Sequence, residues 1–199
     1  MSSIYVVVGD IGSAKEIYAG IMALPPEVEV RWFVDSSAKA KAGTEFLAKL
    51  ENPVFYETRG PQDDDNPDLI IVGTSATACN SQVAWTKWGL GRYPVVWVED
   101  LWGTGECPGI LSVMPDEMLV VDKMAVRIAR TVRPGLKVTI VGKPTFGALP
   151  DALRQAEIRT EIRKRFLIDD DEFLLTIGFG GDPEERAVVQ LPQIVNLLR

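Results

Sequence analysis

Short apolar runs alternate with helix-length segments through most of the chain, and this alternation constrains the fold more than any other feature. Buried-strand patterns rich in Val and Ile recur at 4–9, 28–34, 54–56, 69–72, 95–98, 118–121 and 137–141. Helical patterns lie between them at 13–24, 36–50, 78–89 and 123–132. Because parallel strands need a long crossover, usually a helix, the alternation predicts an α/β fold. We expect a Rossmann-like, mostly parallel sheet with helices on both faces.

The alternation is interrupted by a segment rich in Gly and Pro, which predicts two domains. A charged helix, another strand and a final helix are expected beyond it, at 151–166, 173–178 and 182–199. One βα unit cannot bury its faces alone, so we expect it either to pack on the first domain or to begin a truncated second one. The expected boundaries are 1–142 for an N-terminal Rossmann-like domain, 143–150 for a linker and 151–199 for the start of a second one.

Composition excludes several classes of site. The 199 residues carry a net charge of −7 and contain no histidine, so the commonest general base and metal ligand is missing. The acidic balance argues against nucleic-acid binding, and no apolar run is long enough to span a membrane. The two cysteines, Cys79 and Cys107, are far apart, which argues against a disulfide framework or a zinc site. We therefore expect a cytoplasmic protein without a metal site.

The face of the helix ending at Val132 is predicted from its apolar residues. Met124, Ile128 and Val132 recur at a spacing of four, which indicates one face of an α-helix. We expect these three side chains to point inward.

Two carboxylates directly follow the apolar run 95–98 and are the candidate catalytic residues. Glu99 and Asp100 leave the C-terminal tip of a predicted parallel strand, where α/β proteins bind their ligands. A carboxylate in a cleft can act as a general base when burial or a neighbouring charge raises its pKa. The alternative is a solvated turn without chemistry.

The loop after the first strand is a candidate binding loop. It comprises Gly9, Asp10, Gly12 and Ser13, and Lys15 follows in the first helical turn. A strand-to-helix turn can hold an anion through its free backbone N–H groups. The G-x-G-x-x-G spacing of dinucleotide-binding loops is missing. The alternative is a tight turn with Ser13 as the helix cap.

Three other loops carry candidate ligand-binding residues. Thr74 and Ser75 follow the strand at 69–72 and could bind a ligand or cap a helix, while Trp102 could stack on a sugar or a base. Gly180 and Gly181 precede the final helix and could let a phosphate approach. Without histidine, Ser75 cannot belong to a Ser-His-Asp triad.

The order of these segments resembles the N-terminal domain of GT-B-type nucleotide-sugar enzymes, which include many glycosyltransferases and the non-hydrolysing UDP-N-acetylglucosamine 2-epimerases. Pro-Asp-Leu-Ile-Ile-Val at 67–72 and Pro-Val-Val-Trp-Val-Glu at 94–99 are similar to two epimerase segments. Gly-Thr-Gly at 103–105 resembles the end of the second motif, and Val-Gly-Lys-Pro at 141–144 the turn that closes the N-terminal domain. The segment 173–181 resembles the first strand and glycine loop of the C-terminal domain.

The resemblance implies two facing domains, with a nucleotide-sugar, UDP-linked, held mainly by the second as a substrate and with no separate cofactor. Glu99 falls on the functional glutamate of the epimerases, and Gly180 and Gly181 would approach the donor phosphates. Ser75 and Trp97 stand where the epimerases have Asp and His. The resemblance therefore implies a glycosyltransferase in preference to an epimerase. It also implies a fragment, or a chain completed by a separate C-terminal half.

The sequence therefore leads to one hypothesis and two alternatives. The hypothesis is the acceptor-side domain of a GT-B-type glycosyltransferase, acting on an unknown acceptor. The alternatives are a relative of the UDP-sugar 2-epimerases and a non-catalytic module that binds a nucleotide-sugar or a partner. A homo-oligomer is also expected as a possibility. All require the loops that carry Asp10, Ser75 and Glu99 to share one rim of the sheet.

Overall fold

A computed structural model describes residues 2–35, 45–46, 48, 56–57, 59–74, 80–100, 103, 112–145 and 152–169. The chain divides into two compact units, residues 1–149 and 150–199, and each is described by itself. The strand expected at 173–178 and the final helix lie outside the described residues, as do Ser75, Trp102, Gly180 and Gly181.

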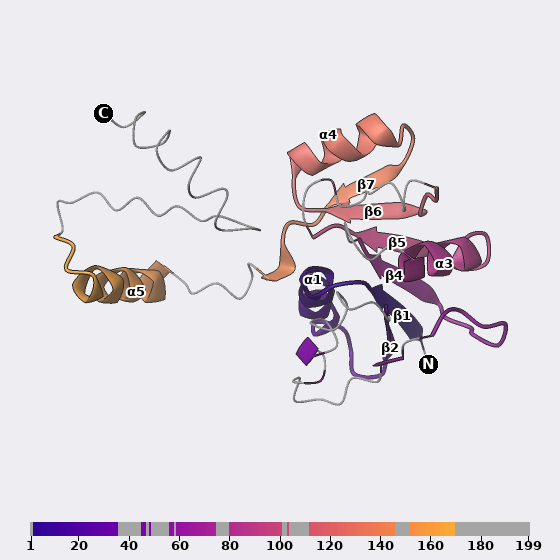
Figure 1. Cartoon of the computed structure of the whole chain (residues 1–199), viewed down its shortest axis with the longest axis horizontal. Helices are drawn as coiled ribbons and strands as arrows, with labels where there is room; N and C mark the ends of the chain where they lie inside the picture. Colours follow the sequence, from indigo (N-terminus) through magenta and orange to yellow (C-terminus); the bar gives the residue numbers. More distant parts are fainter. Residues whose placement is uncertain are drawn as a thin grey trace. The chain divides into compact units, whose positions relative to one another are not determined.

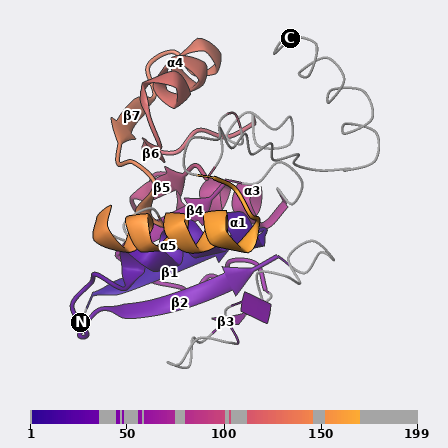
Figure 2. The same ribbon diagram turned by 90° about the vertical axis from the view of Figure 1, so that its left-hand side faces the viewer.

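The first unit is built on a parallel sheet in which the described residues form seven strands, in the order β3-β2-β1-β4-β5-β6-β7 (Figure 1). The strands are β1 (Ser3–Val8), β2 (Glu29–Val34), β3 (Tyr56–Glu57), β4 (Leu69–Gly73), β5 (Val95–Val98), β6 (Glu117–Val120) and β7 (Lys137–Ile140). Every neighbouring pair runs in the same direction, as β1 and β2 do in Figure 2. The predicted Rossmann-like α/β fold is confirmed.

Helices cover both faces of this sheet. They are α1 (Ile11–Ile21), α3 (Asn80–Gly89) and α4 (Lys123–Val132), and the second unit contains α5 (Ala152–Arg165). In the order of the sheet, the step from β1 to β2 runs toward the β3 side, and the step from β4 to β5 runs toward the β7 side. Right-handed crossovers therefore place α1 on one face, and α3 and α4 on the opposite face.

Two cores result, because successive residues of a buried strand point to opposite faces. Val6 and Val8 of β1 pack with Ala14 and Ile17 on the α1 face. Tyr5 and Val7 belong to the opposite core, which contains Trp85 of α3 and Trp97 of β5. Runs of Val and Ile without alternation are the pattern of strands buried on both sides.

Carboxylates one residue outside the helices explain where α1 and α4 begin. Asp10 precedes α1, and its carboxylate accepts a hydrogen bond from the backbone N–H of Ser13. Asp122 precedes α4 and accepts bonds from the N–H groups of Met124 and Ala125. Each satisfies donors that have no partner within the helix. The cap of α1 is thus Asp10 and not Ser13, and the helix begins two residues earlier than its apolar pattern indicated.

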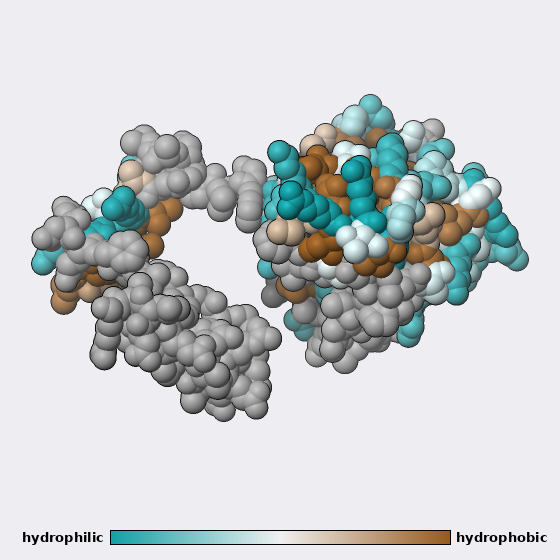
Figure 3. Space-filling view, turned by 90° about the horizontal axis from the view of Figure 1, so that it is seen from above, coloured by the Kyte–Doolittle hydropathy of each residue, from teal (hydrophilic) through white to brown (hydrophobic). Residues whose placement is uncertain are grey.

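The buried face of α4 differs from the expected one. Ala125 and Ala129 are buried, while Met124 is 47% exposed and Val132 39% exposed. The small alanines let the helix axis approach the sheet closely, and the larger apolar residues lie on the flank of the helix. The expectation that Met124 and Val132 point inward is therefore wrong. Apolar spacing marks every apolar residue on one side of the helix, whereas the sheet contacts only part of that side. Figure 3 shows apolar surface among hydrophilic residues on the α4 side of the first unit.

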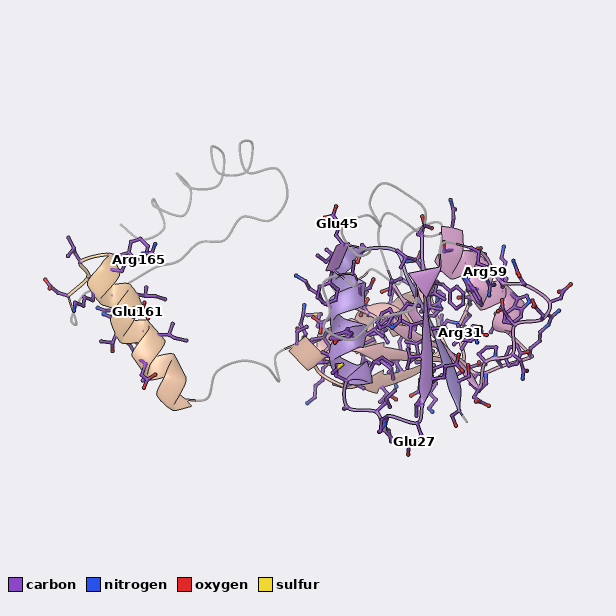
Figure 4. The ribbon with its side chains drawn as sticks, turned by 90° about the horizontal axis from the view of Figure 1, so that it is seen from below. Glu27, Arg31, Glu45, Arg59, Glu161 and Arg165 are labelled. Carbon is purple, nitrogen blue, oxygen red and sulfur yellow. The ribbon has the colours of Figure 1, made fainter. Side chains whose placement is uncertain are left out.

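The second unit is described only around α5, where the expected charged helix is confirmed. Glu161 and Arg165 project from it into solvent (Figure 4). Leu167 follows in the left-handed region, with a φ of 54°. This lets the N–H of Ile168 donate to the carbonyl of Arg163, closing the end of the helix.

A partly buried ion pair organises the loop between β3 and β4: the Asp65 side chain is buried and the Arg59 side chain is 27% exposed. The guanidinium of Arg59 donates two hydrogen bonds to Asp65, at 2.7 and 2.8 Å, and its plane lies over the ring of Phe33. The Asp65 carboxylate also accepts from the backbone N–H of Gln62. The Tyr93 hydroxyl donates to the Asp65 carbonyl. Figure 4 shows the positions of Arg59 and of Arg31 on β2.

The Arg59–Asp65 pair predicts a specific acid sensitivity. Hydrogen bonds from Arg59 hold the pKa of Asp65 below its ordinary value, so the stabilisation is complete above the unfolded-state pKa of about 4 and is lost as the pH falls through the folded-state pKa. We expect Asp65→Asn to lower the free energy of unfolding at pH 7 by about 1–2 kcal/mol, because the remaining Arg59 is 27% exposed and can be solvated in part. Urea titrations at pH 7 and pH 3 measure this. The cost should shrink at pH 3, and an equal cost at both would contradict the assignment; Asp63→Asn, on the exposed part of the loop, is the control.

Candidate functional site

The carboxyl ends of β1, β4 and β5 meet at one edge, because these strands are neighbours and parallel. The direction in which the chain builds the sheet changes between β1 and β4, and α/β proteins bind ligands in the crevice at such a point. Asp10 follows β1, Thr74 follows β4 and Glu99 follows β5. Two of the three residues expected to share a rim, Asp10 and Glu99, therefore lie at the same edge. The third, Ser75, is outside the described residues.

Two carboxylates converge on the N-terminus of α1. A Cβ atom built on Gly12 would lie 2.3 Å from Oδ2 of Asp100 and 3.4 Å from Oδ1 of Asp10. A larger residue at position 12 would have to displace the Asp100 carboxylate. Asp10 also accepts from both the N–H (2.9 Å) and the hydroxyl (3.1 Å) of Ser13. The positive end of a helix dipole favours negative charge, which offsets repulsion between the carboxylates.

Glu99 and Asp100 are both buried, 4% and 7% exposed, so the alternative of a solvated turn is wrong. Oε1 of Glu99 accepts a hydrogen bond from the backbone N–H of Gly103 at 2.9 Å. Gly103 has a φ of 80°, a conformation that glycine adopts readily. The two neighbouring carboxylates point to different places, Glu99 to this turn and Asp100 to Gly12.

Two remaining candidates, Thr74 and Lys15, contact other parts of the first unit. Thr74 is buried, and its N–H and hydroxyl both donate to the carbonyl of Val98. Lys15 is exposed and its ammonium lies over the ring of Phe46. The structure therefore gathers the acidic candidates at the carboxyl edge and gives Thr74 a role in joining β4 to β5.

A segment after β7 reaches this edge, which sequence reasoning did not anticipate. Thr145 donates to Glu16 of α1 through its hydroxyl (2.7 Å) and its N–H (3.1 Å). Nζ of Lys143 lies 3.4 Å from the Glu16 carboxylate and 3.3 Å from the carbonyl of Asp100. Residues 143–145, expected in a linker, thus connect β7 to α1. The one signal was the position of Glu16 in the first turn of a predicted helix, beside the loop that follows β1.

A second unanticipated contact fixes the start of α3. Oδ2 of Asp35, the residue after β2, accepts from the hydroxyl of Ser81 at 2.7 Å and from its N–H at 3.3 Å. Nε2 of Gln82 donates to the carbonyl of Gly73. Asp35 could have been noticed in the sequence, because it follows a strand just as Glu99 does.

The balance of charge limits what this edge can bind. Asp10, Glu16, Glu99 and Asp100 contribute four carboxylates, and Lys143 is the one cation found among these described contacts. The space beside Gly12, where an anion would meet the helix N-terminus, is occupied by the carboxylate of Asp100. Such an edge suits hydroxyl groups, which donate hydrogen bonds to carboxylates, better than a bare phosphate.

Neither a metal-binding cluster nor a membrane-spanning helix is found among the described residues. Among them, no group of three or more acidic or cysteine side chains is arranged to hold a metal ion. The helices within the described ranges are all too short or too polar to cross a bilayer. Comparisons of the chain with protein-family models and with curated proteins find no match.

The contact between Gly12 and Asp100 can be tested by a double-mutant cycle. We expect Gly12→Ala to lower the free energy of unfolding by about 1–3 kcal/mol, because the added methyl group would overlap Asp100. In an Asp100→Ala background the same substitution should cost at least about 1 kcal/mol less. Urea titration of the four proteins measures the coupling. Additive effects would show that Asp100 does not lie against Gly12.

The contact between Glu16 and Thr145 predicts a local change in hydrogen exchange. Glu16→Ala removes the acceptor of the Thr145 N–H, so we expect the Thr145 amide to exchange at least about tenfold faster. Exchange followed by NMR measures this. The matched control is Glu27→Ala, at an exposed position after α1. Unchanged protection of Thr145 would contradict the contact.

Proposed function

We propose that the first unit is the acceptor-side domain of a GT-B-type glycosyltransferase that uses a nucleotide-sugar donor. The observation that carries the proposal is the pair of buried carboxylates, Glu99 and Asp100, at the carboxyl end of β5, near the point where the direction of sheet building changes between β1 and β4. In the proposed complex the acceptor hydroxyl groups donate hydrogen bonds to this acidic edge. The sugar donor, UDP-linked, is held mainly by a second domain.

The two carboxylates have different parts in the proposed reaction. One accepts the proton of the acceptor hydroxyl as its oxygen attacks the anomeric carbon and the nucleotide leaves, or it stabilises the positive charge that develops on the sugar ring. Glu99 already accepts a hydrogen bond from the N–H of Gly103 through Oε1, which makes it suited to holding Gly103 in place. Asp100, lying over α1, is the better candidate for the base.

A non-catalytic binding module is the second candidate, and one observation favours it. The carboxylate of Asp100 fills the position beside Gly12 at which a donor phosphate would meet the N-terminus of α1. A module that binds only the hydroxyl groups of a ligand has no need of that position. No observation favours the 2-epimerase alternative: Trp97, which replaces the histidine of that motif, is buried in the core and donates to the hydroxyl of Thr86.

Binding can be tested with the 199-residue chain by NMR titration. The probes are UDP-, GDP- and CMP-linked sugars and a panel of mono- and disaccharides. We expect a saccharide to perturb the amides around Asp10, Glu99 and Lys143, and we expect Asp100→Asn to weaken its binding at least about tenfold, or about 1.4 kcal/mol. Asp64→Asn, an exposed carboxylate at the amino edge, is the control. If none of the saccharides perturbs the carboxyl edge, the proposed function fails.

Catalysis requires a separate test in a chain that contains both domains. Glu99→Gln keeps an oxygen that can accept from Gly103 but removes the charge, whereas Glu99→Ala removes both. Because Asp100 is the candidate base, we expect Asp100→Asn to lose turnover at saturating acceptor, whereas Glu99→Gln should retain most of it. Normal turnover in Glu99→Gln, with loss only in Glu99→Ala, would leave Glu99 a structural residue. Binding without turnover in the intact protein supports the module.

A further inference from the structure

A series of contacts connects the segment after β7 to Asp100, the candidate base. Both carboxylate oxygens of Glu16 are used: Oε1 accepts from the hydroxyl of Thr145 at 2.7 Å, and Oε2 accepts from its N–H at 3.1 Å. Nζ of Lys143 lies 3.4 Å from Oε1 of Glu16 and 3.3 Å from the carbonyl oxygen of Asp100. The ammonium group of Lys143 therefore bridges α1 and the main chain that carries the candidate base.

The backbone that presents Lys143 has little conformational freedom. Gly142 has a φ of 75°, which lets the chain turn directly after β7. Pro144 has a fixed φ and also restricts the residue before it, Lys143, to extended conformations. Because such a segment has few conformations to lose, it can be held in one position at a small cost in entropy.

The burial of Glu16 explains why the ammonium group stays in place. The Glu16 side chain is 7% exposed, and burying an ionised carboxylate is costly unless it is paired with a charge and hydrogen-bonded. Lys143 supplies the charge and Thr145 supplies two hydrogen bonds. The carboxylate thus restricts the long side chain of Lys143 to the position from which it reaches the Asp100 carbonyl.

The side chain of Asp100 lies where a restraint is needed. Its Oδ2 lies 2.3 Å from the position of a Cβ atom on Gly12, and Oδ1 of Asp10 lies 3.4 Å from the same position. The N-terminus of α1 attracts both carboxylates, but the two like charges also repel each other. Fixing the main chain at Asp100 limits how far its carboxylate can move away from α1.

We propose that Lys143 is a positioning residue for Asp100. Held by Glu16, it fixes the main chain at Asp100 so that the carboxylate stays beside Gly12, where it can accept a hydrogen bond from a saccharide hydroxyl. The part of the proposal that concerns a saccharide rests on the proposed function. The placement of Asp100 by Lys143 does not.

The first experiment measures the placement of Asp100 without a ligand. Gly12→Ala should lower the folding equilibrium constant, because the added methyl group would overlap the Asp100 carboxylate. We expect this loss to be at least about fivefold smaller in a Lys143→Met background, where Asp100 is free to move aside. Lys143→Arg keeps a cation that can donate to both partners and should restore the full loss. Urea titrations of each pair of proteins measure it.

The matched control is Lys87→Met, at an exposed lysine in the last turn of α3, which should leave the Gly12→Ala loss unchanged. Glu16→Gln is a second test of the same contacts. It keeps an oxygen that can accept from Thr145 and removes the charge that holds Lys143, so it should also reduce the loss. A loss as large in Lys143→Met as in the wild type overturns the proposal, and the Glu16→Gln background decides it if Lys143→Met does not fold.

The second experiment measures saccharide affinity by NMR titration with the same panel of mono- and disaccharides. We expect Lys143→Met to weaken the binding of the saccharide that perturbs the carboxyl edge at least about fivefold, and Lys143→Arg to restore it. A merely structural part for Lys143 would lower stability and leave the affinity unchanged, and that result overturns the proposal.

The two experiments separate this proposal from the proposed function. If no saccharide binds the wild-type chain but Lys143→Met reduces the Gly12→Ala loss, the proposed function fails and the placement of Asp100 by Lys143 is supported. If a saccharide binds and the Gly12→Ala loss is the same with and without Lys143, the positioning role alone is overturned.

Discussion

The close approach of α1 to the ends of β4 and β5 is the constraint on which the candidate site depends. It needs two glycines. A Cβ on Gly73 would lie 2.5 Å from Cβ of Ser13, and one on Gly12 would meet Asp100. With these Cβ atoms missing, the helix settles against the sheet, and its first turn joins the residues that follow β4 and β5. Glu16 is then placed where the segment after β7 can reach it.

This geometry gathers carboxylates at the carboxyl edge and also places groups that stabilise their negative charge. Asp10 and Asp100 are close to one point, but the N–H groups and dipole of α1 stabilise their charge. Lys143 compensates Glu16 and binds the Asp100 carbonyl, which fixes the backbone that carries the candidate base. The result is a preorganised set of acceptors, and the proposed recognition of hydroxyl groups depends on it.

The candidate site lies at one end of the sheet because parallel strands bring all their carboxyl ends to the same edge. Its location therefore follows from topology. Helix α4 buries Ala125 and Ala129 against the same sheet and leaves Met124 and Val132 exposed, because the contact with the sheet is narrower than the apolar face of the helix.

The sequence by itself determined the local elements and the strand tips. Alternating apolar runs predicted the parallel sheet, and Glu99 and Asp100 were recognisable because they follow such a run directly. Tertiary structure decided which side chains meet. Glu16 and Thr145 are 129 residues apart, and Asp35 and Ser81 are 46 apart, so no local pattern pairs them. It also decided the buried face of α4 and the burial of Asp65. Residue spacing along the chain predicts helices and strands. Which side chains contact each other depends on the order of the strands in the sheet and on how closely the backbones approach.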